Sequence, residues 1–460
     1  MKLLTPLQLG KLHLRNRVVM APMTRNRADA RGVVGATTVR YYAQRATAGL
    51  VITEATNISE EAKGHPMTPG IWSAEQVEAW KAVTSAVHAA GGTIVMQLWH
   101  TGRVGHSDVR DGRVPVAPSA IAIEGQQHFT PTGPKPYEVP RALTTDEVRA
   151  TVDDYERGAR NAKAAGFDGV ELHGAFGYLP NEFLVDGANQ RTDAYGGSVE
   201  NRARFVLEVM QRLVAVWGDG RVGIRLSPTL AYNGMVDTDP LATFSYLLER
   251  LNAMPLAYLH LMRATPDAGR FPSWPRDTIA TFGPLFRGAL VVNGGYDRDA
   301  AEAVVTSGAA HAVSFGAPFV SNPDLVHRLE SGAPLATPDR NTFYQGGERG
   351  YVDYPALDAD PPQAPKGYWL VQATITDPAQ FAKYAAAAGP VIASYGGRAI
   401  ARGDVAEVVE GTVPRRPYFV EFPSHAAARA CYRSAGYEDA IALRSGAAHF
   451  DVVIVEGTGG

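Results

Sequence analysis

Short apolar runs, many of them rich in β-branched residues, alternate with longer amphipathic stretches over roughly the first 330 residues of this chain. The predicted strands are Val18–Ala21, Leu50–Glu54, Thr93–Leu98, Gly169–His173, Val222–Leu226, Ala257–Leu261, Ala289–Asn293 and Ala312–Phe315. Between them, stretches such as Thr145–Ala165 and Ser198–Trp217 have the period of a helix. Near-continuous apolar strands separated by helices are typical of a parallel sheet that is buried on both faces.

Eight such units favour an α/β fold of the closed (β/α)8 type, a TIM barrel, over an open Rossmann sheet. No Gly-x-Gly-x-x-Gly motif follows a predicted strand, which argues against a dinucleotide-binding sheet. Apolar and polar residues alternate over Pro6–Arg15 on both sides of a Gly-Lys turn. This pattern predicts a hairpin that plugs the bottom of the barrel. Residues Arg103–Pro140 are too long and too rich in Gly and Pro for a simple connection, so we expect an insertion that covers the mouth.

A proline-rich linker over residues 358–366 is predicted to separate the barrel domain, residues 1–357, from a small domain over residues 367–460. In that domain the predicted strands are Tyr368–Thr374, Gly397–Gly403, Ala406–Glu410, Pro417–Phe422 and Phe450–Glu456, and the predicted helices are Pro378–Ala388 and Ser424–Ser434. A β-α-β-β-α-β order with a final strand is typical of an α+β ferredoxin-like fold.

Composition and charge exclude several classes of protein. Of the 460 residues 45% are hydrophobic and 20% are charged, as in globular proteins, and the net charge of −3 gives no general attraction to nucleic acid or acidic membranes. No apolar run reaches the roughly 18 residues of a membrane span, and Met1–Leu4 lacks the apolar region of a secretion signal. The single Cys431 excludes an intrachain disulfide, and the histidines lack metal-ligand spacing. We therefore expect a cytoplasmic enzyme without a metal, a nucleic-acid partner or membrane association.

The stretch Asp168–Tyr178 carries the clearest chemical signal. A short apolar run ends in His173, and Tyr178 follows five residues later. Catalytic side chains of (β/α)8 barrels lie at the carboxyl ends of strands. A histidine can donate a hydrogen bond to an oxygen that gains charge, and a tyrosine is a weak acid that keeps its proton at neutral pH. This pair suits polarising a carbonyl group and then protonating its α-carbon.

The first 357 residues resemble the Old Yellow Enzyme family of FMN-dependent ene-reductases, in particular its bacterial N-ethylmaleimide reductase branch. The matching stretches are Arg15–Arg25, Gln97–Arg103, Gly166–Tyr178, Arg191–Arg202, Gly223–Pro228 and Asn322–Leu325. Residues 367–457 resemble a family of small dimeric ferredoxin-like domains of unassigned role, with matches over Gly397–Gly403 and Pro417–Pro423. The apolar sheet face of such a domain is usually covered by a second copy, so we expect a homodimer.

The resemblance implies that FMN lies across the barrel mouth, with NAD(P)H as electron donor, and that hydride passes from flavin N5 to an electron-poor alkene. It assigns Tyr178 as the proton donor and His173 as the group that orients the acceptor. The implied cofactor-binding residues are Pro22, Met23, Thr24, Ala55, Gln97, His173, Arg225, Asn293, Gly294, Gly295, Phe315, Gly316 and Ala317. The implied substrate-binding residues are His65, Trp99, Phe176, Tyr178 and Tyr351.

Some of these assignments have structural alternatives. Thr24 could cap a helix, and Gln97, which can donate and accept at once, could pair with buried backbone. Arg225 lies in an otherwise apolar strand, where a guanidinium needs an anionic partner, and a structural salt bridge would also supply one. Trp99 could serve only in packing.

Three positions depart from the family pattern. Phe176 stands where the family has a second donor, histidine or asparagine, and the loss of one donor raises a barrier by roughly 2–4 kcal/mol. Ala317 replaces the arginine that clamps the FMN phosphate, which lowers affinity roughly ten- to hundredfold. His65 replaces a substrate-lining tyrosine and is either a substitute donor or a plain loop histidine.

We therefore predict an FMN-dependent NAD(P)H oxidoreductase that reduces electron-poor alkenes, with a pocket made more apolar by Phe176. One alternative keeps FMN but catalyses dehydrogenation or a redox-neutral rearrangement. Another is a flavin-free scaffold that has lost cofactor binding with the phosphate arginine.

Overall fold

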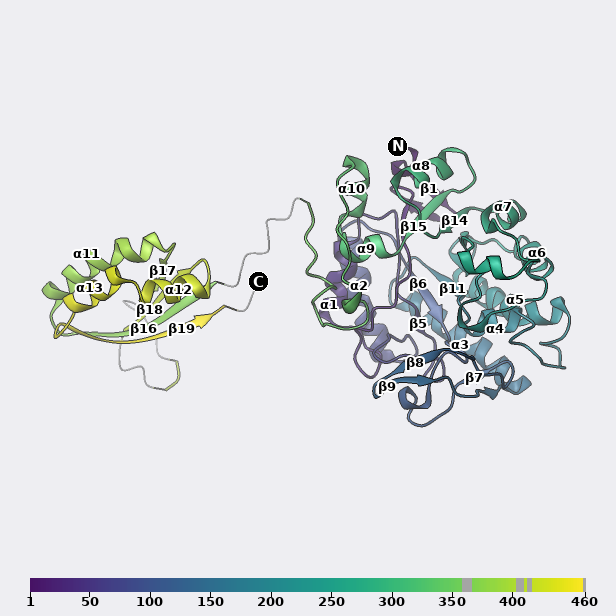
Figure 1. Ribbon diagram of the computed structural model, residues 1–460, viewed down its shortest axis with the longest axis horizontal. Helices are drawn as coiled ribbons and strands as arrows, with labels where there is room; N and C mark the ends of the chain where they lie inside the picture. Colours follow the sequence, from purple (N-terminus) through teal and green to yellow (C-terminus); the bar gives the residue numbers. More distant parts are fainter. Residues whose placement is uncertain (358–365, 403–408, 412–415, 458–460) are drawn as a thin grey trace. The chain divides into compact units, whose positions relative to one another are not determined.

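Eight parallel strands close into a barrel in the computed structural model, which describes residues 1–357, 366–402, 409–411 and 416–457 (Figure 1). The strands are β3 (Val18–Met20), β4 (Leu50–Ile52), β6 (Ile94–Trp99), β11 (Gly169–Gly174), β12 (Val222–Leu226), β13 (Tyr258–Met262), β14 (Leu290–Asn293) and β15 (Ala312–Phe315). Pairing runs in this order from β11 to β15, continues through β3, β4 and β6, and returns to β11. The predicted (β/α)8 fold and its eight strands are confirmed, with ends that differ by one or two residues.

Helices surround the barrel, and their apolar faces explain why they form. They are α1 (Ala36–Gln44), α2 (Ala74–Ala89), α3 (Thr145–Ala164), α4 (Leu179–Leu184), α5 (Val199–Trp217), α6 (Pro240–Leu251), α7 (Thr278–Phe282), α8 (Arg298–Thr306), α9 (Ala317–Ser321) and α10 (Leu325–Ser331). In α3, Thr144 and Glu147 form a reciprocal capping box, and Val148, Val152 and Tyr155 are buried at helical spacing.

The bottom of the barrel is closed by the predicted hairpin, strands β1 (Leu7–Leu9) and β2 (Leu12–Leu14). Leu9, Leu12 and Leu14 pack against the lower interior of the barrel in one buried apolar cluster. Glycine is required at position 10, where φ is +54° and a Cβ atom would lie 2.5 Å from the Gly220 carbonyl oxygen. The plug leaves the carboxyl ends of the strands as the open end.

The insertion between β6 and α3 contains β7 (Val116–Ala117), β8 (Gln127–Thr130), β9 (Gly133–Pro136) and β10 (Arg141–Ala142). Strands β8 and β9 form an antiparallel hairpin. The guanidinium of Arg103 fastens the insertion, because it donates to the carbonyl oxygens of Ile121, Asn233 and Gly234. Residues of the insertion line the cavity at the barrel mouth, as the sequence predicted.

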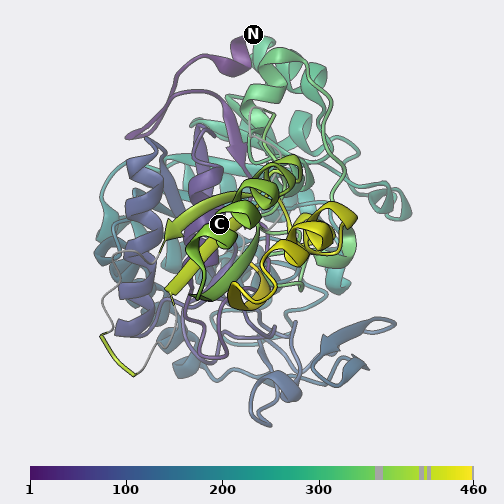
Figure 2. The same ribbon diagram turned by 90° about the vertical axis from the view of Figure 1, so that its left-hand side faces the viewer.

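The chain divides into two compact units, residues 1–357 and 358–460. The second unit contains β16 (Gly367–Ile375), α11 (Pro378–Ser394), β17 (Arg398–Arg402), β18 (Arg416–Phe422), α12 (His425–Tyr432), α13 (Ala435–Leu443) and β19 (Ala448–Glu456). Its sheet is antiparallel in the order β17-β18-β16-β19, and α11, α12 and α13 lie on one face (Figures 1 and 2). This is the predicted ferredoxin-like arrangement.

Three details of this unit differ from the expectation. Helix α11 continues six residues past Ala388, through Pro390, because Val391 and Ile392 pack against the core of the unit. Helix α13 was not predicted, although Ser434 caps it and Tyr437 is buried. Most of the predicted strand Ala406–Glu410, like most of the predicted linker, lies outside the described residues.

Candidate functional site

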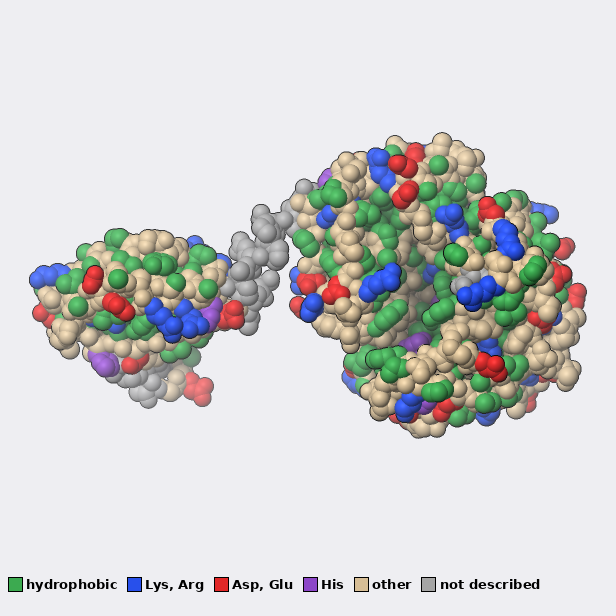
Figure 3. All heavy atoms as spheres, viewed as in Figure 1, with side chains coloured by type: hydrophobic (Ala, Val, Ile, Leu, Met, Phe, Trp, Pro, Cys, Tyr) green, Lys and Arg blue, Asp and Glu red, His purple; other side chains and the backbone are tan. Residues whose placement is uncertain are grey.

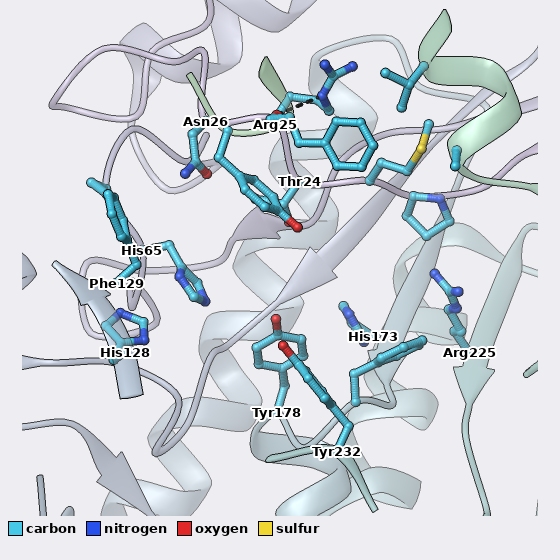
Figure 4. A pocket seen from close by; sticks show the side chains of 18 of the residues that line it. Thr24, Arg25, Asn26, His65, His128, Phe129, His173, Tyr178, Arg225 and Tyr232 are labelled. Atoms are coloured by element: carbon cyan, nitrogen blue, oxygen red, sulfur yellow. Dashed lines mark hydrogen bonds between the residues drawn. The ribbon is translucent and has the colours of Figure 1, made fainter. Parts of the chain in front are cut away.

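A cavity of about 490 Å³ opens at the carboxyl ends of the barrel strands, where the catalytic side chains of this fold lie. The space-filling view shows a hollow in this face of the first unit, and Figure 4 shows the side chains directed into the cavity (Figures 3 and 4). The lining residues are Pro22, Met23, Thr24, Arg25, Asn26, His65, Pro66, Gln127, His128, Phe129, Tyr137, His173, Phe176, Tyr178, Arg225, Tyr232, Ala317, Val320, Phe343 and Tyr344.

Nine of the predicted site residues are among these, namely Pro22, Met23, Thr24, His65, His173, Phe176, Tyr178, Arg225 and Ala317. Eight others, Ala55, Gln97, Trp99, Asn293, Gly294, Gly295, Phe315 and Gly316, lie on or just after the barrel strands but do not line the cavity. Thr24 does not cap a helix, because α1 begins after Gly35. Its hydroxyl group is therefore available to a ligand.

Tyr351, unlike the other predicted site residues, neither lines the cavity nor lies on or just after a barrel strand. Its side chain is fully buried, and its ring stacks on Tyr41 with 4.2 Å between the ring centres. Phe343 and Tyr344, earlier in the same irregular segment, line the cavity instead. The expectation for Tyr351 is not met, because sequence alone does not determine which aromatic side chain of an irregular segment faces inward.

A tight turn after β11 brings Tyr178 back over His173. Phe176 and Gly177 both have left-handed backbone conformations, with φ of +61° and +80°. The Phe176 amide donates to Ser227 Oγ at 3.0 Å, and its carbonyl oxygen accepts from Asn233 Nδ2 at 2.9 Å. These bonds hold the turn, and the rings of His173 and Tyr178 meet edge to face with 4.8 Å between their centres.

The two side chains at the centre of the cavity are uncharged. Burial lowers the pKa of His173 well below its usual value, and the nearby Arg225 lowers it further, so the imidazole is neutral. Its Nδ1 atom is buried without a hydrogen-bond partner among the described residues. Burial also raises the pKa of Tyr178 well above its usual value, so the phenol keeps its proton. A neutral donor and a weak acid therefore face the same space.

Arg225 supplies positive charge at the far wall of the cavity. Its Nη2 atom donates to Asn293 Oδ1 at 2.7 Å, so its hydrogen-bond partner is an amide rather than the carboxylate of a salt bridge. Its Nε atom is buried with no partner among the described residues, and the guanidinium carbon lies 4.9 Å from the centre of the Phe176 ring. Burial lowers the pKa of Arg225 to about 10, which still leaves it charged at neutral pH. A buried donor without an acceptor indicates a site for an electron-rich ligand.

Below this wall the barrel interior holds a polar layer that the sequence did not predict. The carboxylate of Glu171 accepts from Gln97 Nε2 at 2.7 Å and lies 3.0 Å from His260 Nδ1. His260 Nε2 in turn lies 2.7 Å from Ser314 Oγ. Gln97 therefore pairs with a carboxylate rather than with backbone. Alternate residues of a strand face the same side, so Glu171 could have been predicted to point into the barrel like His173.

Aromatic rings form the wall on the side of the insertion. Trp99 is fully buried behind the cavity, 4.9 Å from the Tyr178 ring and 5.6 Å from the His65 ring between centres. The His65 ring lies 4.7 Å from that of His128. Burial lowers the pKa of His65 to about 3, so this histidine is neutral as well. Trp99 thus has a packing role, and His65 is part of the cavity wall rather than a plain loop residue.

Glu182 of α4, next to this site, makes barrel stability depend on pH. It is fully buried, Arg103 N–H donates to its Oε1 atom at 2.8 Å, and burial raises its pKa from 4.5 to about 8. The folded state therefore binds this proton more tightly, so stability falls as pH rises from about 4.5 to 8.

As the pH is raised from about 5 to about 9, wild type should lose stability that Glu182→Gln keeps. We expect the free energy of unfolding of the variant, relative to that of wild type, to increase by on the order of a few kcal/mol over this range. Denaturant unfolding at the two pH values measures this. Glu147→Gln is the control, because the pKa of Glu147 is lowered to about 2 and no such gain is expected. An equal stability difference at both pH values would show that Glu182 does not titrate in this range.

No helix among the described residues has the length and apolar character that crossing a membrane requires. In the same part of the chain, no group of three or more His, Cys, Asp or Glu side chains is arranged to hold a metal ion.

Comparison with family models divides the chain at the same place as the structure. Residues 2–336 match the NADH:flavin oxidoreductase / NADH oxidase family. Residues 366–458 match a domain of unknown function, DUF1330. The putative 12-oxophytodienoate reductase 4 of Oryza sativa subsp. japonica is 45% identical over 361 residues, which cover 77% of this chain and 93% of that protein. The probable flavin mononucleotide-dependent alkene reductase of Leishmania infantum is 44% identical over 363 residues, 77% of this chain and 97% of the relative.

Solved structures agree with these relatives. Morphinone reductase in complex with tetrahydroNAD has a TM-score of 0.73 and 49% identity, and the match covers 78% of this chain and 98% of that one. The Old Yellow Enzyme homologue from Zymomonas mobilis has a TM-score of 0.74 and 44% identity, over 78% and 100% of the two chains. The resemblance read from the motifs is confirmed, and the chain belongs to the NADH:flavin oxidoreductase / NADH oxidase family.

Proposed function

We propose that this protein reduces the C=C bond of electron-poor alkenes, such as α,β-unsaturated carbonyl compounds, with FMN as cofactor and NAD(P)H as electron donor. The observation that carries the proposal is the neutral imidazole of His173 beside the protonated phenol of Tyr178, 4.8 Å apart between ring centres. Relatives named as alkene and 12-oxophytodienoate reductases support it. They do not favour a redox-neutral enzyme or a flavin-free scaffold.

The residues at the barrel mouth fit FMN. The unpartnered Nε atom of Arg225 and Nδ1 atom of His173 are buried donors or acceptors that a flavin ring would satisfy. Bound FMN would supply hydride-transfer chemistry between NAD(P)H and the β-carbon of the alkene. We assign its binding to the barrel domain, residues 1–357, with the ring near Thr24, His173 and Arg225.

We assign packing against the ring to Pro22, Met23, Ala55, Phe315 and Gly316. Gln97, which is held by the Glu171 carboxylate, is assigned to the polar edge of the ring. Asn293 supports Arg225. Gly294, Gly295 and Ala317 follow β14 and β15, where we place the phosphate. The φ of +121° favours glycine at position 294, and a Cβ atom there would make a tight contact of 3.0 Å with Arg263 Cβ.

His173 and Tyr178 have separate roles toward the substrate, one as hydrogen-bond donor and the other as proton donor. The His173 imidazole donates a hydrogen bond to the carbonyl oxygen, which makes the β-carbon more electron-poor. The Tyr178 hydroxyl group gives its proton to the α-carbon as the double bond is lost. Phe176, His65 and the insertion enclose the substrate, and the low water content of such a site strengthens both interactions. Trp99 holds the Tyr178 ring from behind.

The two half-reactions test the proposal. We expect NAD(P)H to bleach the bound flavin in an anaerobic stopped-flow experiment, and an enone such as cyclohexenone to restore its colour. A flavin that NAD(P)H does not reduce would instead support a redox-neutral enzyme. A protein that binds no flavin would support the scaffold.

The pKa shifts predict how activity depends on pH. Because His173 is already neutral and Tyr178 stays protonated, we expect kcat/KM for the alkene to be constant from about pH 6 to pH 9. Arg225 is charged below its pKa of about 10, so the rate should fall as pH approaches that value. Flavin reoxidation by enone, followed across this range, provides the measurement. A transition with a midpoint near pH 6.5 would mean that His173 titrates like an ordinary histidine.

We also propose that the protein is a cytoplasmic homodimer whose second unit supplies the contact. Leu370 of β16 lies opposite Phe419 and Val453 on the sheet face that carries no helix. Val453 is 55% exposed and Ile400 on β17 is 47% exposed. Apolar patches of this kind mark interaction surfaces. Light scattering of wild type and of Val453→Glu tests the proposal, and a monomeric wild type would refute it.

A further inference from the structure

The phosphate end of the proposed FMN site lacks a free cation among the residues that line the cavity. Ala317 stands where the family resemblance implies an arginine. The Arg25 guanidinium is fully engaged, since it donates to Tyr41 Oη and to the carbonyl oxygens of Phe343 and Gly350. Arg225 is bonded to Asn293, and its unpartnered Nε atom is the one that we assign to the flavin ring. A phosphate after β14 and β15 would therefore need its positive charge from elsewhere.

Arg263 lies at the end of the barrel where we place the phosphate. It follows β13 directly, and its backbone N–H donates to the Asn293 carbonyl oxygen at 2.8 Å, which places it beside the end of β14. Its Nη1 atom donates a long hydrogen bond of 3.4 Å to the Gly294 carbonyl oxygen, and its guanidinium carbon lies 4.8 Å from the centre of the Tyr296 ring. The side chain is exposed, so it can turn toward a ligand without disturbing the core.

The Gly294–Gly295 turn lies next to Arg263 and has open space at Gly295. Its φ values are +121° and +69°, and a Cβ atom at Gly295 would meet nothing within 4 Å. Strands β13, β14 and β15 are direct neighbours in the sheet. Since adjacent strands lie about 4.8 Å apart, Arg263 and Ala317 are separated by roughly 10 Å at the backbone. A phosphate between them is within reach of a long side chain.

We propose that Arg263 is the phosphate-binding cation of this protein, supplied from β13 in place of an arginine after β15. The proposal rests on the proposed FMN site and names the residue that recognises one end of the ligand. A guanidinium pairs with phosphate through two parallel hydrogen bonds, and the Gly294–Gly295 backbone would bind the remaining oxygens. Arg276 and Arg298 are held by shorter hydrogen bonds than Arg263, to the carbonyl oxygens of Ala268 at 2.6 Å and Leu329 at 2.7 Å.

The test compares FMN with riboflavin, which has the same ring system but no phosphate. Fluorescence titration of the full chain gives the Kd of each. We expect Arg263→Ala to raise the Kd for FMN about 10- to 100-fold and to leave the Kd for riboflavin unchanged. Unchanged riboflavin binding also shows that the variant is folded. Arg276→Ala is the matched control and should change neither Kd.

A second variant tests the location of the charge. Adding Ala317→Arg to Arg263→Ala should restore FMN affinity, because it returns a guanidinium to the same phosphate from the end of β15. If wild type prefers FMN to riboflavin and Arg263→Ala keeps that preference, the assignment of Arg263 is wrong while the FMN site stands. If wild type binds neither flavin, the proposed function itself fails.

Discussion

Tyr178→Phe is expected to slow alkene reduction by about 10²- to 10⁴-fold, the usual contribution of a positioned general acid. The substitution removes only the hydroxyl group, because the ring keeps its edge-to-face contacts with Trp99 and His173. Burial holds the pKa of the phenol so high that it serves as a proton donor at any ordinary pH. Without it, the α-carbon has to take its proton from water in an enclosed cavity.

The effect should be confined to one half-reaction. Stopped-flow measurement of the variant should show normal FMN binding and normal reduction by NAD(P)H, with slow reoxidation by the enone. Tyr232→Phe is the matched control, since Tyr232 also lines the cavity and points into it (Figure 4) but is half exposed at the rim, so only a small loss is expected. Equal losses in both variants would argue against Tyr178 as the proton donor.

Phe176→His is expected to raise kcat/KM for a simple cyclic enone by about 10- to 100-fold. Phe176 lines the cavity near His173, with 6.1 Å between ring centres, so an imidazole there can add a second hydrogen bond to the substrate carbonyl. The gain is an order-of-magnitude estimate from the cost of deleting one such donor. Backbone conformation also favours the change, because the φ of +61° at Phe176 is left-handed and histidine adopts that region more readily than most residues.

A matched variant separates the donor from the loss of bulk. Phe176→Leu removes the aromatic ring without adding a donor, so it should not raise the rate for the same enone. Steady-state kinetics with NAD(P)H and cyclohexenone compares the three proteins. Unchanged activity in Phe176→His would mean that one donor, His173, already suffices in this cavity.

The barrel could be predicted in detail because its signals are local. Each strand is an apolar run ended by a polar or small residue, and helices such as α3 begin at a capping box. In the second unit, the helix predicted to end at Ala388 continues to Ser394, because Val391 and Ile392 pack against the core. Propensity predicts an element well only where tertiary contacts agree with it.

Lining residues that follow strands could be assigned from the sequence, whereas several that come from irregular segments were missed. His173, Tyr178 and Arg225 lie on or just after β11 and β12, so the barrel topology places them at the mouth. Tyr232 and Tyr344 reach the same cavity from loops whose path depends on long-range contacts. Glu171 was overlooked for a different reason, since its neighbours in the barrel interior come from strands far apart in sequence.

Flavin content after incubation with FMN tests the central claim most directly. We predict that the protein, freed of unbound cofactor by gel filtration, retains about one FMN per chain and loses its yellow colour when NAD(P)H is added without oxygen. A protein that leaves the column colourless after saturation with FMN would contradict the claim that this barrel mouth is a flavin site.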